Sequence, residues 1–184
     1  MRTDAPRVIG MIGGMSWESS AEYYRLANEV VRERLGGLHS ARCVLASMDF
    51  ADVERLQVAG RWEEAGELLA EAARGLETAG ADLLLLCTNT MHKVADQVQA
   101  AVGIPLMHIA DATAAAVARA DLHTVGLLGT AFPMEQDFYR DRVHSHGLKV
   151  LNPLADDTAK WHRVIHEEPG PGRAPGGALQ GPPA

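Results

Sequence analysis

The chain has 184 residues, which is long enough to bury one sizeable core or two smaller ones. With 47% hydrophobic and 22% charged residues, its composition is that of a globular protein, and its longest apolar run is too short to span a bilayer. The net charge of −7 argues against a nucleic-acid or anionic-membrane partner. Its two cysteines stand far apart and predict neither a disulfide framework nor a metal site, so we expect a reducing, cytoplasmic location.

Strand-length apolar runs alternate with segments of helical periodicity through the first two thirds of the chain. Ser16 is placed to cap the first helix, Gly36-Gly37 to end it, and Gly80 to end the second. We predict strands at 7–14, 41–50, 82–87 and 104–109, and helices at 16–37, 61–80, 90–103 and 111–120.

The pattern then restarts and finally breaks off. We expect a strand at 123–130, a helix from Pro133 to Gly147, a strand at 148–153 and a helix at 156–168. Continuous apolar strands separated by helices predict an α/β fold with parallel sheets. We therefore expect a first α/β domain at 1–110 and a shorter, incomplete second one at 111–168. Residues 169–184 include ten Pro or Gly and predict a disordered tail.

Small polar residues follow three of the expected strands. They are Gly13-Gly14-Met15-Ser16, Cys87-Thr88-Asn89-Thr90 and Gly129-Thr130. In parallel α/β sheets, ligands bind beyond the carboxyl ends of the strands, and the helix starts that follow favour anions. The pattern therefore predicts a site for a small molecule that carries a carboxylate.

Cys87 has two interpretations. A strand cysteine is usually a small hydrophobic core residue, which is our interpretation of Cys43 in mid-strand. Cys87 instead falls at the strand end, where a following helix dipole is expected to stabilise a thiolate and lower its pKa. Its neighbours are small and can form hydrogen bonds. On this ground the core and the catalytic interpretations remain equally open.

Two further patterns point elsewhere. The stretch "GMIGGMS" partly matches a dinucleotide loop, with Asp49 as the available acidic residue, but it lacks the complete glycine spacing and is weak evidence for a nucleotide. Among the histidines, His92 is placed either to orient a substrate or to cap a turn, and His108 reads as an interior residue. No set of residues has convincing metal-ligand spacing.

At several of these segments the sequence resembles the aspartate/glutamate racemase family, which works without pyridoxal phosphate or another cofactor. The resemblance runs from about Val8 to about Glu168, through "VIGMIGGMSWESSAEYY", "CTNTMHKVADQV", "IPLMHIADATA", "VGLLGT" and "GLKVLNP". It implies two pseudo-symmetric domains with an active site in the cleft between them. It also implies an amino-acid substrate, and a homodimer is common in such families.

By this resemblance Cys87 is the first of two cysteines that act on opposite faces of the substrate α-carbon. One thiolate removes the α-proton, and the opposite thiol returns a proton to the other face. The match further implies that Met15, Ser16, Thr88, Asn89, Thr90, Gly129, Thr130 and Lys160 bind the substrate.

The sequence departs from the family pattern at its end. Nothing resembles the later "GCTE"-like motif that carries the second cysteine, and the Pro/Gly tail stands in its place. We therefore expect an amino-acid racemase with impaired two-base activity, and we interpret the ending as a truncation, for example by a frame change. The alternative is a non-catalytic amino-acid-binding or interaction protein that keeps the fold.

Overall fold

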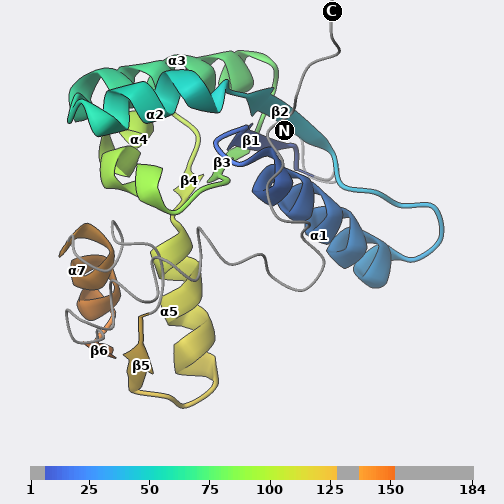
Figure 1. The fold of residues 1–184 in the computed structure, drawn as a ribbon. Coiled ribbons are helices and arrows are strands. Elements are labelled where there is room, and N and C mark those ends of the chain that lie inside the picture. The colour runs from blue at the N-terminus through green and yellow to red at the C-terminus, as the bar shows by residue number, and fades with distance from the viewer. Residues whose placement is uncertain (1–6, 128–136, 152–184) are drawn as a thin grey trace, which may run out of the picture. The chain divides into compact units, whose positions relative to one another are not determined.

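A computed structural model describes residues 7–127 and 137–151. The chain divides into two compact units, Met1–Ala112 and Thr113–Ala184. The first unit contains a parallel sheet and its helices (Figure 1). Its elements are β1 (Ile9–Gly13), α1 (Trp17–Leu35), β2 (Cys43–Ser47), α2 (Phe50–Val58), α3 (Trp62–Thr78), β3 (Leu83–Leu86), the 3₁₀ helix η1 (Thr90–Val94), α4 (Ala95–Ala100), β4 (Leu106–Met107) and the start of α5 (Ile109–Arg119).

The four strands of the first unit are all parallel and follow the order β2-β1-β3-β4. Gly10 pairs with Val44 on one side and with Leu84 on the other, so β1 lies at the centre. Paired residues of parallel strands point to the same face, and successive residues alternate between faces. The sheet therefore has one face with Ile12, Leu84 and Leu86, and a second face with the residues between them.

The first face carries the core. Helix α3 buries Ala65, Leu69, Ala73 and Leu76, whose spacing of three or four residues places them on one side of the helix. These side chains pack with the strand residues of that face in one cluster, together with Val53 of α2 and with η1 and α4. Burying a leucine of this kind stabilises the fold by about 1.5–3 kcal/mol. Helices α2 and α3 lie together on this side of the sheet in Figure 1.

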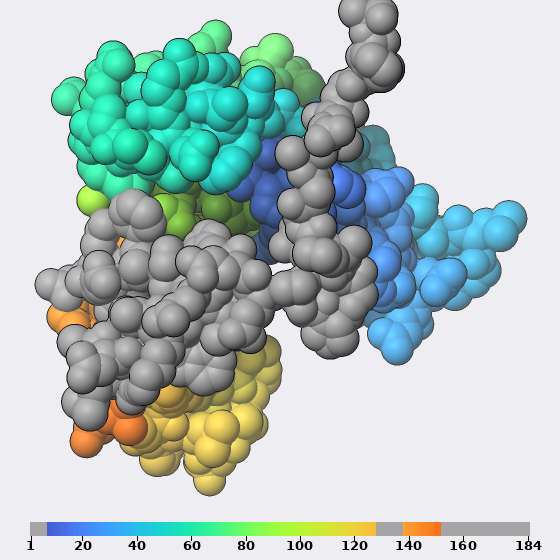
Figure 2. Space-filling model, viewed as in Figure 1, coloured from blue at the N-terminus to red at the C-terminus, as the bar shows by residue number. Residues whose placement is uncertain are grey.

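The second face is covered by α1. A hollow of about 330 Å³ remains between this helix and the strands, lined by apolar side chains such as Leu26, Val30 and Leu85. Nearby apolar residues stay accessible, for example Leu45 (48% exposed) and Met107 (50% exposed). The loop after α1 projects from the unit in Figure 2, and Leu38 on it is fully exposed. Leu45 and Met107 are thus exposed apolar side chains on this face.

The described part of the second unit is smaller. It contains most of α5, then β5 (Thr124–Gly126), α7 (Asp137–Ser145) and β6 (Lys149–Leu151), with β5 and β6 paired in parallel. Tyr139, Val143 and Leu148 are buried within it. Both units thus consist of parallel strands and helices, which confirms the expected α/β class. The helix predicted at 156–168 and the tail at 169–184 lie outside the described residues.

Several predicted boundaries are wrong; for example, α5 begins at Ile109, where a strand was expected to end. The strand predicted at 41–50 ends at Ser47, because Asp49 caps a helix that the pattern did not predict and its carboxylate accepts from the Ala51 N–H at 3.0 Å. The helix predicted at 90–103 begins as a 3₁₀ turn and continues only to Ala100. In the part of the chain that the structure describes, no helix is long and apolar enough to cross a membrane.

Candidate functional site

The candidate site lies where the order of the strands reverses. From β1 the chain first forms β2 on one side and later β3 on the other, so the carboxyl ends of β1 and β3 flank the switch point. The two ends are joined there, since the Cys87 N–H donates to the Ile12 carbonyl at 2.9 Å. Open parallel sheets bind their ligands at this point. The topology thus brings the loop after β1 and the loop at Cys87 to the same edge.

The loop after β1 is a tight glycine turn. Gly14 has a φ of +87°, and its N–H donates to the buried hydroxyl of Ser20 at 2.9 Å. A hydrogen bond from the Met48 N–H to the Gly13 carbonyl, 2.9 Å long, ties the turn to the end of β2. Ser16 caps α1, as predicted, because its hydroxyl accepts from the Ser19 N–H at 3.2 Å.

These contacts weaken the nucleotide interpretation. A phosphate loop presents its backbone N–H groups to the ligand. Here the Gly14 N–H is used by Ser20, and the Ser19 N–H by Ser16. Asp49, the residue considered for a ribose, caps α2 instead. The glycine turn therefore serves the connection between β1 and α1.

Cys87 is fully buried at the end of β3. Its carbonyl accepts from the Ser19 hydroxyl at 3.4 Å, which links it to the first turn of α1. Burial raises the pKa of its thiol to about 12, because the charged thiolate loses its hydration. The expected lowering by a helix dipole is therefore wrong: a short 3₁₀ segment follows Cys87, and desolvation is the dominant cause. At neutral pH the group is a thiol.

The other expected site residues differ in their surroundings. Thr88 and Thr90 are half-buried beside Cys87, and the Asn89 side chain is exposed. Ser16 is exposed at the start of α1, whereas Met15 is only 4% exposed and packs in the core cluster. The structure thus groups Cys87, Thr88, Asn89 and Thr90 in one loop beside the glycine turn. Gly129, Thr130 and Lys160 lie outside the described residues.

Ser19 and Ser20 are site residues that the sequence reasoning missed. Both lie in the first turn of α1, and their hydroxyls contact the Cys87 carbonyl and the Gly14 N–H. The sequence indicates their role only by their position, three and four residues after the capping Ser16. Polar side chains in a first helical turn can reach back to the preceding loop. Both hydroxyls therefore support the backbone around the candidate site.

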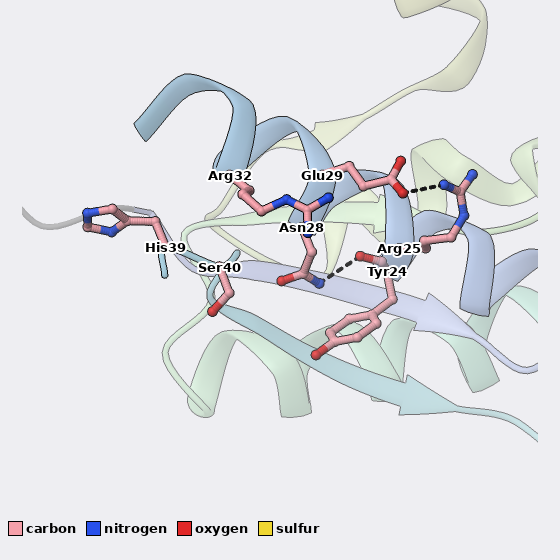
Figure 3. A pocket seen from close by; sticks show the side chains of 7 residues that line it. All are labelled: Tyr24, Arg25, Asn28, Glu29, Arg32, His39 and Ser40. Atoms are coloured by element: carbon pink, nitrogen blue, oxygen red, sulfur yellow. Dashed lines mark hydrogen bonds and ion pairs between the residues drawn. The ribbon is translucent and has the colours of Figure 1, made fainter. Parts of the chain in front are cut away.

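A separate hollow lies along α1 from Tyr24 to Arg32 (Figure 3). It has a volume of about 390 Å³ and is closed on one side by His39 and Ser40, which precede β2. It therefore lies toward the amino ends of the strands, away from Cys87. Two pairs of its residues bind one another: Arg25 forms an ion pair with Glu29 at 2.6 Å, and the Asn28 amide donates to the Tyr24 carbonyl at 2.8 Å. We assign it no functional role.

Within residues 7–127 and 137–151, no group of three or more His, Cys, Asp or Glu side chains is arranged to hold a metal ion.

Comparison with known proteins agrees with this architecture. The family model described as Asp/Glu/Hydantoin racemase matches residues 12–175, which is most of the chain. The chain belongs to this racemase family. The match includes both the glycine turn and the Cys87 loop. The expected enzyme class, an amino-acid racemase, is thus confirmed at the level of the family.

Solved structures of racemase-family proteins are similar to this chain. A protein from Yersinia pestis, provisionally designated an Asp/Glu racemase, is 50% identical with a TM-score of 0.85, over 88% of this chain and 70% of its own. An aspartate racemase homologue from Pyrococcus horikoshii OT3 is 33% identical with a TM-score of 0.79, over 88% and 71% of the two chains. Picrophilus torridus aspartate racemase, 18% identical with a TM-score of 0.68 over 88% and 70%, shows likeness of fold alone.

Proposed function

We propose that this racemase-family chain acts on aspartate, glutamate or a closely related small amino acid, with Cys87 as the acid and base on one face of the α-carbon. The observation that carries the proposal is the place of Cys87. It lies at the switch point of a parallel sheet, buried, in a loop with Thr88, Asn89 and Thr90. Met15, Ser16, Gly129, Thr130 and Lys160 remain proposed substrate-binding residues.

The chemistry follows from the state of the thiol. As a thiolate, the Cys87 Sγ takes the α-proton and becomes a thiol while the electron pair moves into the substrate carboxylate. As a thiol, it returns a proton to the same face. Because burial raises the pKa of Cys87 to about 12, the thiolate is rare until a positive group approaches. The ammonium group of an amino acid supplies that charge, so substrate binding favours loss of the thiol proton to water and thus the reactive thiolate.

We further propose that two-base racemisation is impaired. Cys43 is the chain's other cysteine, and it pairs with Ile9 at the amino end of the sheet. The carboxyl end, where Ile12 pairs with Ala46, lies three residues further along β2. At about 3.3 Å per residue, this is a separation of about 10 Å along the strand. Cys43 therefore does not serve as the second thiol, and the opposite face depends on water or another acid.

The proposal includes a homodimer, no nucleic-acid partner and a cytoplasmic location. The exposed apolar side chains on the second face of the sheet support the dimer. The net charge of −7 disfavours nucleic acid, and two free cysteines are typical of a reducing compartment. Sedimentation at several protein concentrations tests the dimer, and a single monomeric species at all of them would refute it.

The test of activity is α-proton exchange in D₂O, followed by proton NMR on L- and D-aspartate and L- and D-glutamate separately. We expect exchange of one enantiomer only, lost in Cys87→Ser and retained in the matched variant Cys43→Ser. Exchange of both enantiomers would refute the impairment. No exchange with any of the four, from folded protein, would refute catalysis and leave the alternative of an amino-acid-binding protein, which calorimetric titration with the same four ligands would then examine.

A further inference from the structure

His92 connects the Cys87 loop to the start of α5. It lies in η1 and is only 3% exposed. Its Nδ1 is 2.7 Å from the Thr88 carbonyl oxygen, and its Nε2 accepts from the Ile109 N–H at 3.2 Å. A backbone N–H can only donate, so Nε2 carries a lone pair and the ring proton sits on Nδ1, from which it is donated to Thr88. Both ring nitrogens are thus bound to the main chain.

The same ring contacts the main chain just before the 3₁₀ turn. In an α-helix the His92 N–H would bond to the Thr88 carbonyl, four residues back. Here the His92 N–H donates to the Asn89 carbonyl at 3.1 Å, and the Thr88 carbonyl lies 2.7 Å from Nδ1 of the His92 ring. The imidazole therefore adds a side-chain hydrogen bond to the loop that carries Thr88 and Asn89.

Two histidine side chains bind the first residues of α5. His108 precedes the helix, and its Nδ1 accepts from the Ala110 N–H at 3.1 Å. The rings of His92 and His108 meet edge to face, with centroids 4.5 Å apart. The first two N–H groups of α5 thus both bond to imidazole lone pairs, which suits the partial positive charge of a helix N-terminus. α5 is also the helix that continues beyond Ala112 into the second unit.

We propose that His92 is a positioning residue, which as the Nδ1–H tautomer fixes the Cys87–Thr90 loop to the first turn of α5. The inference rests on the proposed function, because the loop matters to the reaction only if Cys87 transfers the proton. His92 itself takes no proton-transfer step, since its two nitrogens bind Thr88 and Ile109. Its role is to hold the reacting sulfur and its neighbours in place, where a shift of about 1 Å lowers a rate by about 100-fold.

Three substitutions separate the two hydrogen bonds of the ring. His92→Asn keeps a donor near the Nδ1 position, His92→Gln keeps an acceptor near the Nε2 position, and His92→Leu removes both. We expect His92→Leu to lower the rate of α-proton exchange by about 10–100-fold. His92→Asn restores most of it because the bond to Thr88 returns, and His92→Gln restores less. The control is His39→Leu, an exposed histidine in the separate α1 hollow, which leaves the rate unchanged.

Two measurements do not depend on activity. In the wild-type protein, nitrogen-15 NMR of the imidazoles at neutral pH should show that the His92 ring is protonated on Nδ1 and unprotonated on Nε2. In a Cys43→Ser background, iodoacetamide should alkylate Cys87 at least about 10-fold faster in His92→Leu than in the parent, since a released loop exposes the thiol. Rescue by His92→Asn separates loop positioning from a general loss of stability, which thermal unfolding of each variant records.

The outcomes are distinct for the two proposals. An Nε2–H or doubly protonated His92, or equal alkylation rates in the parent and in His92→Leu, would overturn the positioning role. The expected tautomer and alkylation pattern in a protein with no α-proton exchange would support the positioning role and refute the proposed function. If His92→Leu does not fold, the wild-type tautomer and the contrast between His92→Asn and His92→Gln decide the question.

Discussion

The buried hydroxyl of Ser20 accepts from the N–H of Gly14 at 2.9 Å and so closes the turn between β1 and α1. The same hydroxyl donates to the Ser16 carbonyl at 3.1 Å. One side chain thereby satisfies two main-chain groups at the edge of the sheet where Cys87 also lies.

Ser20→Ala should lower the free energy of unfolding by about 1–3 kcal/mol, because the Gly14 N–H loses its acceptor in a buried place. The matched variant is Ser19→Ala, in the same helical turn. Its hydroxyl makes a longer bond, 3.4 Å to the Cys87 carbonyl, so we expect a loss below about 1 kcal/mol. Urea unfolding of both variants measures the difference. Equal losses would contradict the role given to Ser20.

Gly14→Ala should be more damaging. Gly14 has a φ of +87°, a region that costs other residues about 1–2 kcal/mol, and an added Cβ would overlap the carbonyl oxygen of Met48. We expect a total loss above about 3 kcal/mol, since backbone has to move. Gly60→Ala is the control: φ there is +69°, but the space around a Cβ is open. Guanidinium unfolding should show only the conformational loss for Gly60→Ala, and a similar loss at both positions would refute the steric argument.

The buried thiol predicts a pH dependence of stability. The pKa of Cys87 rises from 9.0 to about 12 on folding. Between these values the folded state retains a proton that the unfolded state has lost, so the free energy of unfolding falls as pH rises, by about 1.4 kcal/mol per pH unit. Because other groups also titrate there, the test is the difference between the wild type and Cys87→Ala in urea unfolding from pH 8 to 11. If the free energy of unfolding changed with pH in the same way in both proteins, the raised pKa of Cys87 would be contradicted.

The two faces of the sheet should differ in their sensitivity to truncation. Leu84→Ala removes a fully buried side chain from the core face, and we expect a loss of about 2–5 kcal/mol. Leu45→Ala acts in the same sheet on the opposite face, where the side chain is 48% exposed, and should cost less than about 1 kcal/mol. Thermal unfolding at low protein concentration compares them. A large loss for Leu45→Ala would mean that the Leu45 side chain is covered in solution.

Much of the fold was predictable because its signals are local. The run from Leu83 to Leu86 is apolar throughout, as expected for a strand buried between layers, and the apolar spacing in α3 identifies its core face. Gly36 and Gly80 end their helices with positive φ values, as their positions predict. Helix α2 was missed because Phe50 reads as the end of the preceding strand, although Asp49 is a capping residue.

The site was less predictable because it depends on contacts between distant residues. The position of Cys87 follows from the sequence, but the pKa of its thiol depends on burial by the rest of the unit. The first part of the expected helix is a 3₁₀ turn, next to which the His92 ring contacts the Thr88 carbonyl. Likewise, the contact between His92 and Ile109 joins residues 17 positions apart, which no periodic pattern indicates.

The protonated state of Cys87 also has a consequence for redox chemistry. Peroxides and disulfides react with thiolates, and both need access to the sulfur. Without substrate, a fully buried sulfur with a pKa of about 12 offers neither, so Cys87 should then resist conversion to sulfenic acid and to mixed disulfides. The half-buried Cys43 is the more accessible of the two. The burial that restrains the proposed proton carrier thus also preserves it under oxidative stress.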